Sequence, residues 1–268
     1  MGNHQRCWIW GRHLVLETLR AQRWPILEII ASEELSANDS RVVLQLAERH
    51  NVPVTIATSD RLKQLSKAND HQGLLAKMPP FPFSSLQDLL NRTHGPLAIL
   101  ILDRIQDPHN FGAIIRVAEV LGMHGIVIGD RHQADVTSAV ARSSAGAVNH
   151  LPIVQQSNLR ATVETLKNSG VRIVATAMRT GVPLSDWNFN QPAAIIMGNE
   201  STGIADELLQ LCDATVHIPQ AGQIESLNAA VAAGIVCYEL QRQRNAHTTL
   251  IELLHESQHV DTASPESP

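Results

Sequence analysis

The sequence of 268 residues predicts an α/β protein made of two units. Apolar runs of strand length alternate with stretches of helical periodicity over residues 97–242. A shorter alternation of the same kind occupies residues 8–77. Between them, Pro79–Pro80–Phe81–Pro82 can neither continue a helix nor join a central strand. We therefore expect a domain at residues 1–78, a linker at 79–96 and a larger domain at 97–244.

The first domain is expected to be a small α/β fold. Its first helix spans 11–23, with apolar side chains on one side, and Pro25 is expected to stop it. Two further helices are expected to be capped by Asn38–Asp39–Ser40 and by Ser59–Asp60. The expected strands are 26–31, 52–57 and 73–78.

In the second domain, the strands are continuously apolar, which is typical of a parallel sheet buried on both faces by helices. The expected strands are 97–102, 125–129, 171–177, 193–197 and 214–218. The expected helices are 111–121, 136–143, 159–168, a short one after Gly203, and 227–242, besides one at 86–92 in the linker. Residues 245–268 are expected to form a tail that is disordered from near Ser257.

Composition limits the classes of protein that the chain can be. With 44% apolar and 18% charged residues it can bury a core, and a net charge of −5 excludes a uniformly basic protein. The first domain has a small excess of basic residues, so it is the better candidate to approach a polyanion. No apolar run is long enough for a membrane span or a signal peptide, and three scattered cysteines suit the reducing cytoplasm.

Three segments after apolar strands carry candidate site residues. In residues 102–116, Asp107–Pro108 sets a turn, Asn110 is suited to cap the helix, and Arg116 lies about two turns into it. Arg116 has two interpretations: a surface residue of an amphipathic helix, or a contact for an anion.

Residues 195–204 form a strand that runs into a loop bounded by glycines. Gly198 would let a ligand approach the backbone, and Glu200 offers a polar contact; the alternative is an ordinary turn with a solvated carboxylate. No Lys-Ser/Thr pair follows and no GxGxxG is present, so neither a nucleoside triphosphate nor a Rossmann dinucleotide site is supported.

Residues 218–233 leave a strand at Pro219 and enter an Ala-rich helix. Ser226 and Asn228 near its start are suited to cap it, and could also hold a substrate oxygen or phosphate. The 13 histidines are scattered without the spacing of a metal site, so no metal is expected.

In this order and spacing, LDRIQDPHNFGAIIRVAEVLG, IIMGNESTGI and IPQAGQIESLNAAVAAGI resemble the SpoU (TrmH-like) family of S-adenosyl-L-methionine (AdoMet)-dependent RNA ribose 2′-O-methyltransferases, in the SPOUT class. VARSSAGAVNHLPI resembles the segment that lies between the first two of these motifs. WIWGRHLVLETLR and DHQGLLAKM resemble the substrate-binding domain of the subgroup that methylates a guanosine ribose in 23S ribosomal RNA.

The resemblance implies a SPOUT trefoil-knot domain at 97–244, preceded by a ribosomal-protein-like RNA-binding domain, and a homodimer formed through the knot region. It implies that AdoMet binds in the loops around 198–203 and 218–227. The catalytic positions it implies are Asn110, Arg116, Glu200, Ser226 and Asn228. The cofactor positions are Thr176, Gly198, Asn199, Ile218 and Leu227. Gln220 and Ala229–Ala230 depart from the family pattern beside the cofactor loop.

The expected reaction is methyl transfer from AdoMet to the 2′-OH of a specific guanosine in 23S rRNA, in a precursor of the large subunit. DNA is not an expected substrate, because it lacks the 2′-OH. Because a guanidinium has a pKa above about 12, Arg116 is expected to position a phosphate or the developing alkoxide, and a deprotonated Arg is the less favoured role. The first domain is expected to contact RNA through Arg6, Arg12, Arg20 and Arg23. Two alternatives stay open: a tRNA ribose methyltransferase, or a non-catalytic RNA-binding factor of ribosome assembly.

Overall fold

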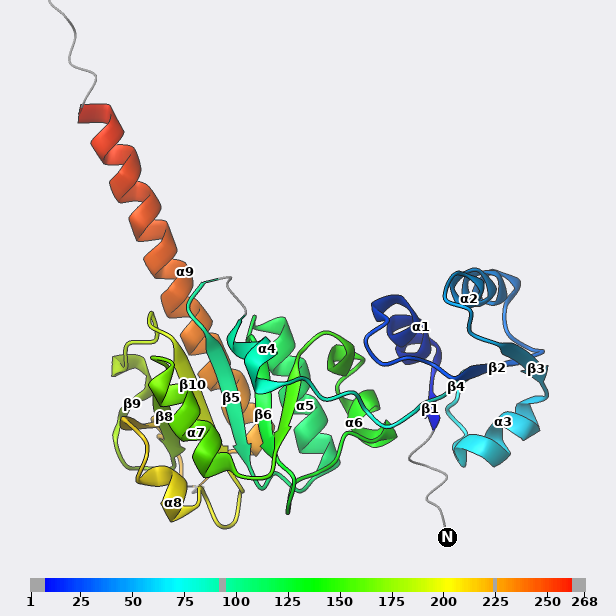
Figure 1. The fold of residues 1–268 in the computed structure, drawn as a ribbon, viewed down its shortest axis with the longest axis horizontal. Coiled ribbons are helices and arrows are strands. Elements are labelled where there is room, and N and C mark those ends of the chain that lie inside the picture. Colours follow the sequence, from blue (N-terminus) through cyan, green and yellow to red (C-terminus); the bar gives the residue numbers. More distant parts are fainter. Residues whose placement is uncertain (1–7, 92–94, 224–225, 262–268) are drawn as a thin grey trace, which may run out of the picture.

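The computed structural model describes residues 8–91, 95–223 and 226–261 (Figure 1). The N-terminal part forms a four-stranded sheet in the order β1–β4–β2–β3. β4 is antiparallel to β1 and β2, whereas β2 and β3 are parallel. The strands are β1 (Trp8–Trp10), β2 (Glu28–Ser32), β3 (Val54–Ala57) and β4 (Leu74–Lys77). The helices are α1 (Arg12–Ala21), α2 (Ala37–Arg49) and α3 (Ser59–Ser66).

The ends of these helices differ from the sequence-based expectation. The cap of α2 is Ser36, whose Oγ accepts from the Asp39 backbone N–H at 3.1 Å, and the cap of α3 is Thr58. α1 ends before Pro25, because Gln22 adopts a left-handed conformation with φ 56°. The predicted caps at 38–40 and 59–60 and the predicted stop at Pro25 are therefore wrong by a few residues, although all three helices exist.

The second sheet has seven parallel strands in the order β7–β6–β5–β10–β8–β11–β9. Its strands are β5 (Ala98–Asp103), β6 (Gly125–Gly129), β7 (Ile153–Gln156), β8 (Arg172–Ala177), β9 (Val182–Pro183), β10 (Ala193–Gly198) and β11 (Ala214–His217). The five predicted strands are confirmed, and the edge strands β7 and β9, like β1, were not predicted.

Helices cover both faces of this sheet, which confirms the predicted α/β class. They are α4 (Leu86–Leu90), α5 (Pro108–Val120), α6 (Ser138–Ser143), α7 (Leu159–Asn168), α8 (Asp206–Leu209) and α9 (Ala229–Asp261). Alternate residues of β5 enter separate cores: Leu100 and Leu102 pack on the side of α5 and α9, and Ile99 and Ile101 on the side of α7. A strand buried on both faces needs an uninterrupted apolar run.

α9 is longer than expected. It continues past Arg242 to Asp261 and extends beyond the rest of the fold (Figure 1). The expected disordered tail therefore begins inside a helix, and 262–268 lie outside the described residues. No helix in the described ranges is long and apolar enough to cross a membrane.

Candidate active site

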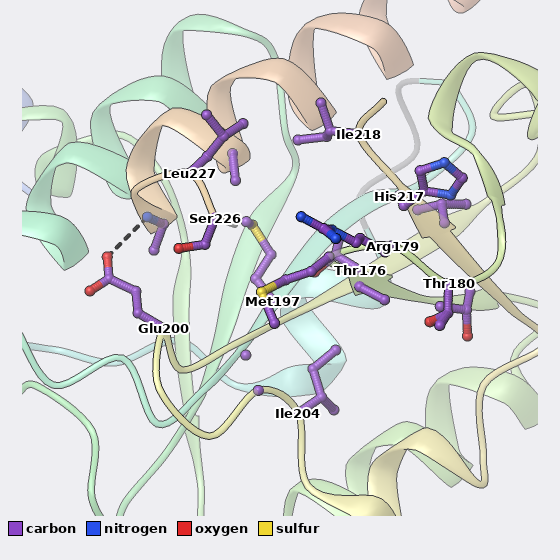
Figure 2. Close-up of a pocket in the computed structure, with 18 of the residues that line it drawn as sticks. Thr176, Arg179, Thr180, Met197, Glu200, Ile204, His217, Ile218, Ser226 and Leu227 are labelled. Carbon is purple, nitrogen blue, oxygen red and sulfur yellow. Dashed lines mark hydrogen bonds between the residues drawn. The ribbon is translucent and has the colours of Figure 1, made fainter. Parts of the chain in front are cut away.

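A cavity of about 820 Å³ opens at the carboxyl ends of β8, β10 and β11 (Figure 2). Its walls come from the loops that follow these strands and from the start of α9. Ligands of open parallel sheets bind at this edge, because the loops after neighbouring strands converge there. Within the described parts of the chain, no group of three His, Cys, Asp or Glu side chains is arranged to hold a metal ion.

The loop after β10 is closed by its own hydrogen bonds. The backbones of Asn199 and Gly203 pair at 2.9 and 3.2 Å, and Asn199 Oδ1 accepts from the Ser201 N–H at 2.8 Å. A Cβ on Gly198 would lie 2.3 Å from the carbonyl carbon of Gly203. The close approach that requires glycine at 198 is therefore to the protein's own backbone, whereas the sequence suggested a ligand.

A cluster of polar side chains joins the three motifs. Oε1 of Glu200 accepts from Asn110 Nδ2 at 2.9 Å, from the Ala229 N–H at 3.0 Å and from Asn228 Nδ2 at 3.3 Å (Figure 2 draws one of the bonds of Glu200). Asn228 Nδ2 also donates to Asn110 Oδ1 at 2.9 Å. A carboxylate at the N-terminus of α9 is favoured by the helix dipole. We call Asn110, Glu200 and Asn228 the polar cluster.

Capping explains part of this arrangement. Asn228 Oδ1 accepts from the N–H groups of Ala230 and Val231 at 2.9 and 3.3 Å, so the predicted capping role of this segment is confirmed. The cap of α5 is Asp107, with Pro108 as the first helical residue. The predicted capping role of Asn110 is wrong, because Asn110 lies inside the first turn and is free to reach Glu200.

Seven of the ten site residues named from the sequence line the cavity: Thr176, Gly198, Asn199, Glu200, Ile218, Ser226 and Leu227. Asn110 and Asn228 are not among the lining residues, but both donate to Glu200, which is. Ile224 and Glu225 of the third motif lie outside the described residues.

Arg116 is not brought to the cavity within one chain. It is exposed, and no ion pair or hydrogen bond ties it to the described residues. Six residues along an α-helix correspond to about 9 Å of rise and about 240° of rotation. Arg116 therefore lies on a different face of α5 from Asn110.

Sequence reasoning missed the loop after β8. Arg179 and Thr180 line the cavity, as does His217 at the end of β11 (Figure 2). Gly181 follows with φ +88°, and a Cβ there would lie 2.0 Å from the carbonyl oxygen of Thr215. A glycine shortly after an apolar strand was the available signal for this close turn.

The arginines expected to contact RNA have partners within the chain. Arg12 pairs with Asp39 at 3.0 Å, Arg20 lies 3.8 Å from Glu17, and Arg23 donates to Ser84 Oγ at 2.6 Å. Arg6 lies outside the described residues. RNA contact through these side chains stays a prediction.

Comparison with known families and sequences agrees with this geometry. Residues 97–238 match the SpoU rRNA Methylase family, and residues 8–84 match the family described as RNA 2′-O ribose methyltransferase substrate binding. The chain belongs to the SpoU family. The Bacillus subtilis protein YacO, assigned by name to the TrmH family of tRNA/rRNA methyltransferases, is 32% identical over 247 residues, which cover 91% of this chain and 98% of YacO.

Solved SpoU structures have the same architecture. The SpoU methyltransferase AviRb from Streptomyces viridochromogenes, in complex with AdoMet, matches with TM-score 0.76 and 28% identity over 89% of this chain and 90% of that one. An AdoMet-bound rRNA methyltransferase from Sinorhizobium meliloti matches with TM-score 0.77 and 26% identity, over 88% and 87% of the two chains. The arrangement of a SPOUT methyltransferase domain after a substrate-binding domain is thus common to these SpoU proteins.

Proposed function

We propose that this chain transfers a methyl group from AdoMet to the ribose 2′-OH of a guanosine in 23S rRNA. The observation that carries the proposal is the polar cluster, which joins three loops at the mouth of a cavity. The family match of residues 8–84 supports a 2′-O ribose target, and the AdoMet complexes of SpoU relatives support the methyl donor.

The cavity suits AdoMet in its chemistry. Ile218, Leu227 and Met197 offer apolar surface for an adenine ring, and the backbone of 198–204 offers polar groups beside them. Thr176, Gly198, Asn199, Ile218 and Leu227 are the residues we assign to binding. When bound, AdoMet would supply a methyl group from its sulfonium, with the neutral thioether as the leaving group, and the proton of the 2′-OH would pass to a substrate phosphate or to water. We also propose the family's trefoil knot for this region.

The chain's own residues then have to orient the ribose hydroxyl, since orientation alone is worth about 7–11 kcal/mol in well-positioned systems. Glu200 is held at Oε1 by three donors, while Oε2 accepts no hydrogen bond from the described residues. We assign Oε2 to the ribose hydroxyl, with Asn110 holding the carboxylate in place. Ser226, exposed on the cavity wall in the segment between β11 and α9, is assigned to contact with the substrate.

Arg116 fits the mechanism if the protein is a homodimer. α5 and α9 both begin at the polar cluster and contact each other at Val117 and Gly234. Because the helices run in the same direction, Arg116, one residue before Val117, turns to the same side as Ile235, one residue after Gly234. Among the side chains that the structure describes, the large apolar ones exposed on these two helices are Val120, Val231, Ile235 and Tyr238. A second copy is the occupant we assign to this face, because it would cover the apolar residues and supply Arg116 to a neighbouring site.

A methyl-transfer assay tests the reaction. Purified protein with labelled AdoMet should methylate 23S rRNA at one guanosine ribose, and not tRNA. Labelling of tRNA instead would favour the tRNA alternative. Absence of AdoMet binding by calorimetry, together with absence of label in any RNA, would overturn the proposal and favour the non-catalytic factor.

Arg116→Ala tests the dimer and the role of Arg116 together. We expect it to lose methyl transfer while AdoMet affinity changes little, because Arg116 lies outside the cavity. Mixing Arg116→Ala with Glu200→Ala should raise activity well above that of either variant alone, since a mixed dimer contains one site with both groups. Turnover of Arg116→Ala at the wild-type rate would remove this residue from the mechanism. A monomer by sedimentation, with no recovery on mixing, would remove the dimer.

A further inference from the structure

The N-terminal unit is held against the methyltransferase unit by a short segment, α6 and the 3₁₀ turn Ala147–Asn149 (Figure 1). At the centre of this contact, Asn149 Nδ2 donates to Thr18 Oγ1 of α1 at 2.9 Å, and both residues are buried, at 3% and 0% exposure. A buried hydrogen bond specifies the geometry of a contact, because a shift that keeps both groups buried leaves them unpaired. We call this contact the docking seam.

Apolar packing and a glycine shape the seam around that bond. Leu14, Val15 and Leu19 of α1 belong to the same buried cluster as Ala147 and Val148. Gly146 adopts φ +89°, and a Cβ there would lie 3.2 Å from Glu17 Cγ. The helix α1 therefore lies directly on the backbone of the methyltransferase unit.

A charged group fixes the edge of the seam. The Arg142 guanidinium lies 4.7 Å from the centroid of the Trp10 ring and pairs with Asp70, which also accepts from Trp10 Nε1 at 3.1 Å. Desolvation raises the pKa of Asp70, but the hydrogen bonds from Trp10 and Arg142 and the Arg142 charge outweigh it, so the pKa lies below its ordinary value. Three residues from β1, the turn before β4 and α6 thus form one contact.

The other side of α6 packs on the helix that carries Asn110. Ser143 Oγ donates to the carbonyl of Pro108, the first residue of α5, at 3.2 Å. A Cβ on Gly112 would lie 1.8 Å from Ser143 Oγ, so the two helices are as close as glycine permits. α6 therefore contacts both the first unit and α5.

The start of the linker is also packed. Trp24 Nε1 donates to the Pro79 carbonyl at 3.0 Å, and the Trp24 ring meets Phe81 edge-on at 5.1 Å. Phe81 in turn meets Phe83 at 5.2 Å. These contacts tie the linker to the first unit, and the Ser84 N–H, which donates to the Ile153 carbonyl of β7 at 2.8 Å, ties it to the second.

We propose that the docking seam holds the substrate-binding unit at one fixed position relative to Asn110 and Glu200, and that Thr18, Asn149 and Arg142 are positioning residues for RNA. This inference rests on the proposed function for its kinetic consequence. An RNA bound by the first unit then has to present its target ribose at one separation and orientation. A folded RNA meets that requirement, and a short strand that binds to only one unit does not.

Small-angle X-ray scattering and amide hydrogen exchange on the full chain test the docking itself. The wild-type scattering curve should fit one fixed arrangement of the two units, with slow exchange in α6 and in Ala147–Asn149. Thr18→Arg places a charge in the buried seam and should give an expanded ensemble and faster exchange there. The matched control is Thr165→Arg, the same change at an exposed position of α7, which should behave as wild type.

Kinetics distinguish positioning from a loss of stability. If Thr18→Arg leaves about a tenth of the molecules docked, KM for RNA should rise about tenfold with the AdoMet affinity unchanged. Substitutions in the Arg142–Asp70 ion pair are milder and less prone to cause misfolding. Arg142→Glu should raise KM for RNA, and Asp70→Arg combined with Arg142→Glu should restore it. Arg160→Glu on α7 is the control for the change of charge.

Two results would overturn the inference. One is a wild-type scattering curve that requires separated units; the other is a KM for RNA that is equal in Thr18→Arg, Arg142→Glu and their controls. If the wild type methylates no RNA, the proposed function fails, whereas scattering and exchange still decide whether the units are docked.

Discussion

The two ends of the seven-stranded sheet use hydrogen bonds in opposite ways. At the carboxyl end, Glu200 is held through one oxygen while the other accepts nothing from the described residues. At the amino end, the Arg244 guanidinium donates to four backbone carbonyls, at 2.6–3.0 Å. These carbonyls belong to Phe189, Pro96, Leu97 and Gln191. Desolvation lowers the pKa of Arg244 to about 10.

The helix α9 reaches both ends of the sheet. α9 begins beside the polar cluster, where Asn228 caps it. About four turns later, Arg244 binds carbonyls at the amino end of the sheet. At the amino end, the N–H groups of Arg244 donate to the protein's own carbonyls. These hydrogen bonds contribute stability and leave few donors for a ligand. The carboxyl end keeps an oriented acceptor accessible. The comparison predicts that substitutions at the amino end change the stability of the protein, and that substitutions at the carboxyl end change the rate of methyl transfer.

Glu200 should give the largest effect on activity. Glu200→Ala removes the acceptor for Asn110 and for the Ala229 N–H, and we expect methyl transfer to fall by on the order of 100-fold. Glu200→Gln keeps an acceptor oxygen but removes the charge, so it separates the two contributions. Single-turnover methylation of 23S rRNA is the measurement. A full wild-type rate in both variants would show that the carboxyl end has no role in chemistry.

Arg244→Ala should give the largest effect on stability. It leaves carbonyls at the amino end without a donor, and we expect the free energy of unfolding to fall by about 2–3 kcal/mol. Chemical denaturation measures this change, while AdoMet binding at low temperature should be retained. Arg242→Ala is the matched control, because Arg242 is exposed and pairs only with Glu239 among the described residues. Equal stability of the two variants would contradict the comparison.

The amino-acid pattern predicts the centre of this sheet better than its edges. β10 and the part of β5 before Asp103 are unbroken apolar runs, and the sequence alone places them correctly because burial on both faces favours apolar residues at successive positions. β9 has two residues, Val182–Pro183, and β1 has three. Such short strands form only because a neighbouring strand is already in place, so their own pattern carries little signal.

Similar limits apply to the site. The order of the three motifs predicts that their loops converge, and the bonds of Glu200 show that they do. The spacing of the motifs does not determine at which residue a helix begins, and therefore which way each side chain points. α5 is capped by Asp107 rather than Asn110, so Asn110 lies in the first turn and points toward Glu200. Arg179 was missed because it lines the cavity from a loop with no periodic pattern, and His217 because a strand pattern does not indicate which of its residues faces a cavity.

Asp213 should give the smallest effect, and it depends on pH. At the amino end of β8 and β11, its carboxylate accepts from the Ile173 N–H and from Lys167 Nζ, both at 2.8 Å. Desolvation raises the pKa of Asp213, but these hydrogen bonds and the charges of Lys167 and Arg172 outweigh it, so the pKa lies below its ordinary value. A carboxyl with a lowered folded-state pKa contributes stability above its unfolded pKa of about 3.9, and loses it as the pH falls further.

Asp213→Asn should therefore lower the free energy of unfolding by about 0.5–1 kcal/mol at neutral pH, because the pair with Lys167 is partly exposed and screened. The difference from wild type should shrink below about pH 4, as the wild-type carboxyl takes up its proton. Denaturation between pH 7 and pH 3 measures both effects, with Asp60→Asn as the control at an exposed ion pair. Methyl transfer at neutral pH should be unchanged, because Asp213 lies at the end of the sheet that holds the fold together and not at the end that faces the substrate.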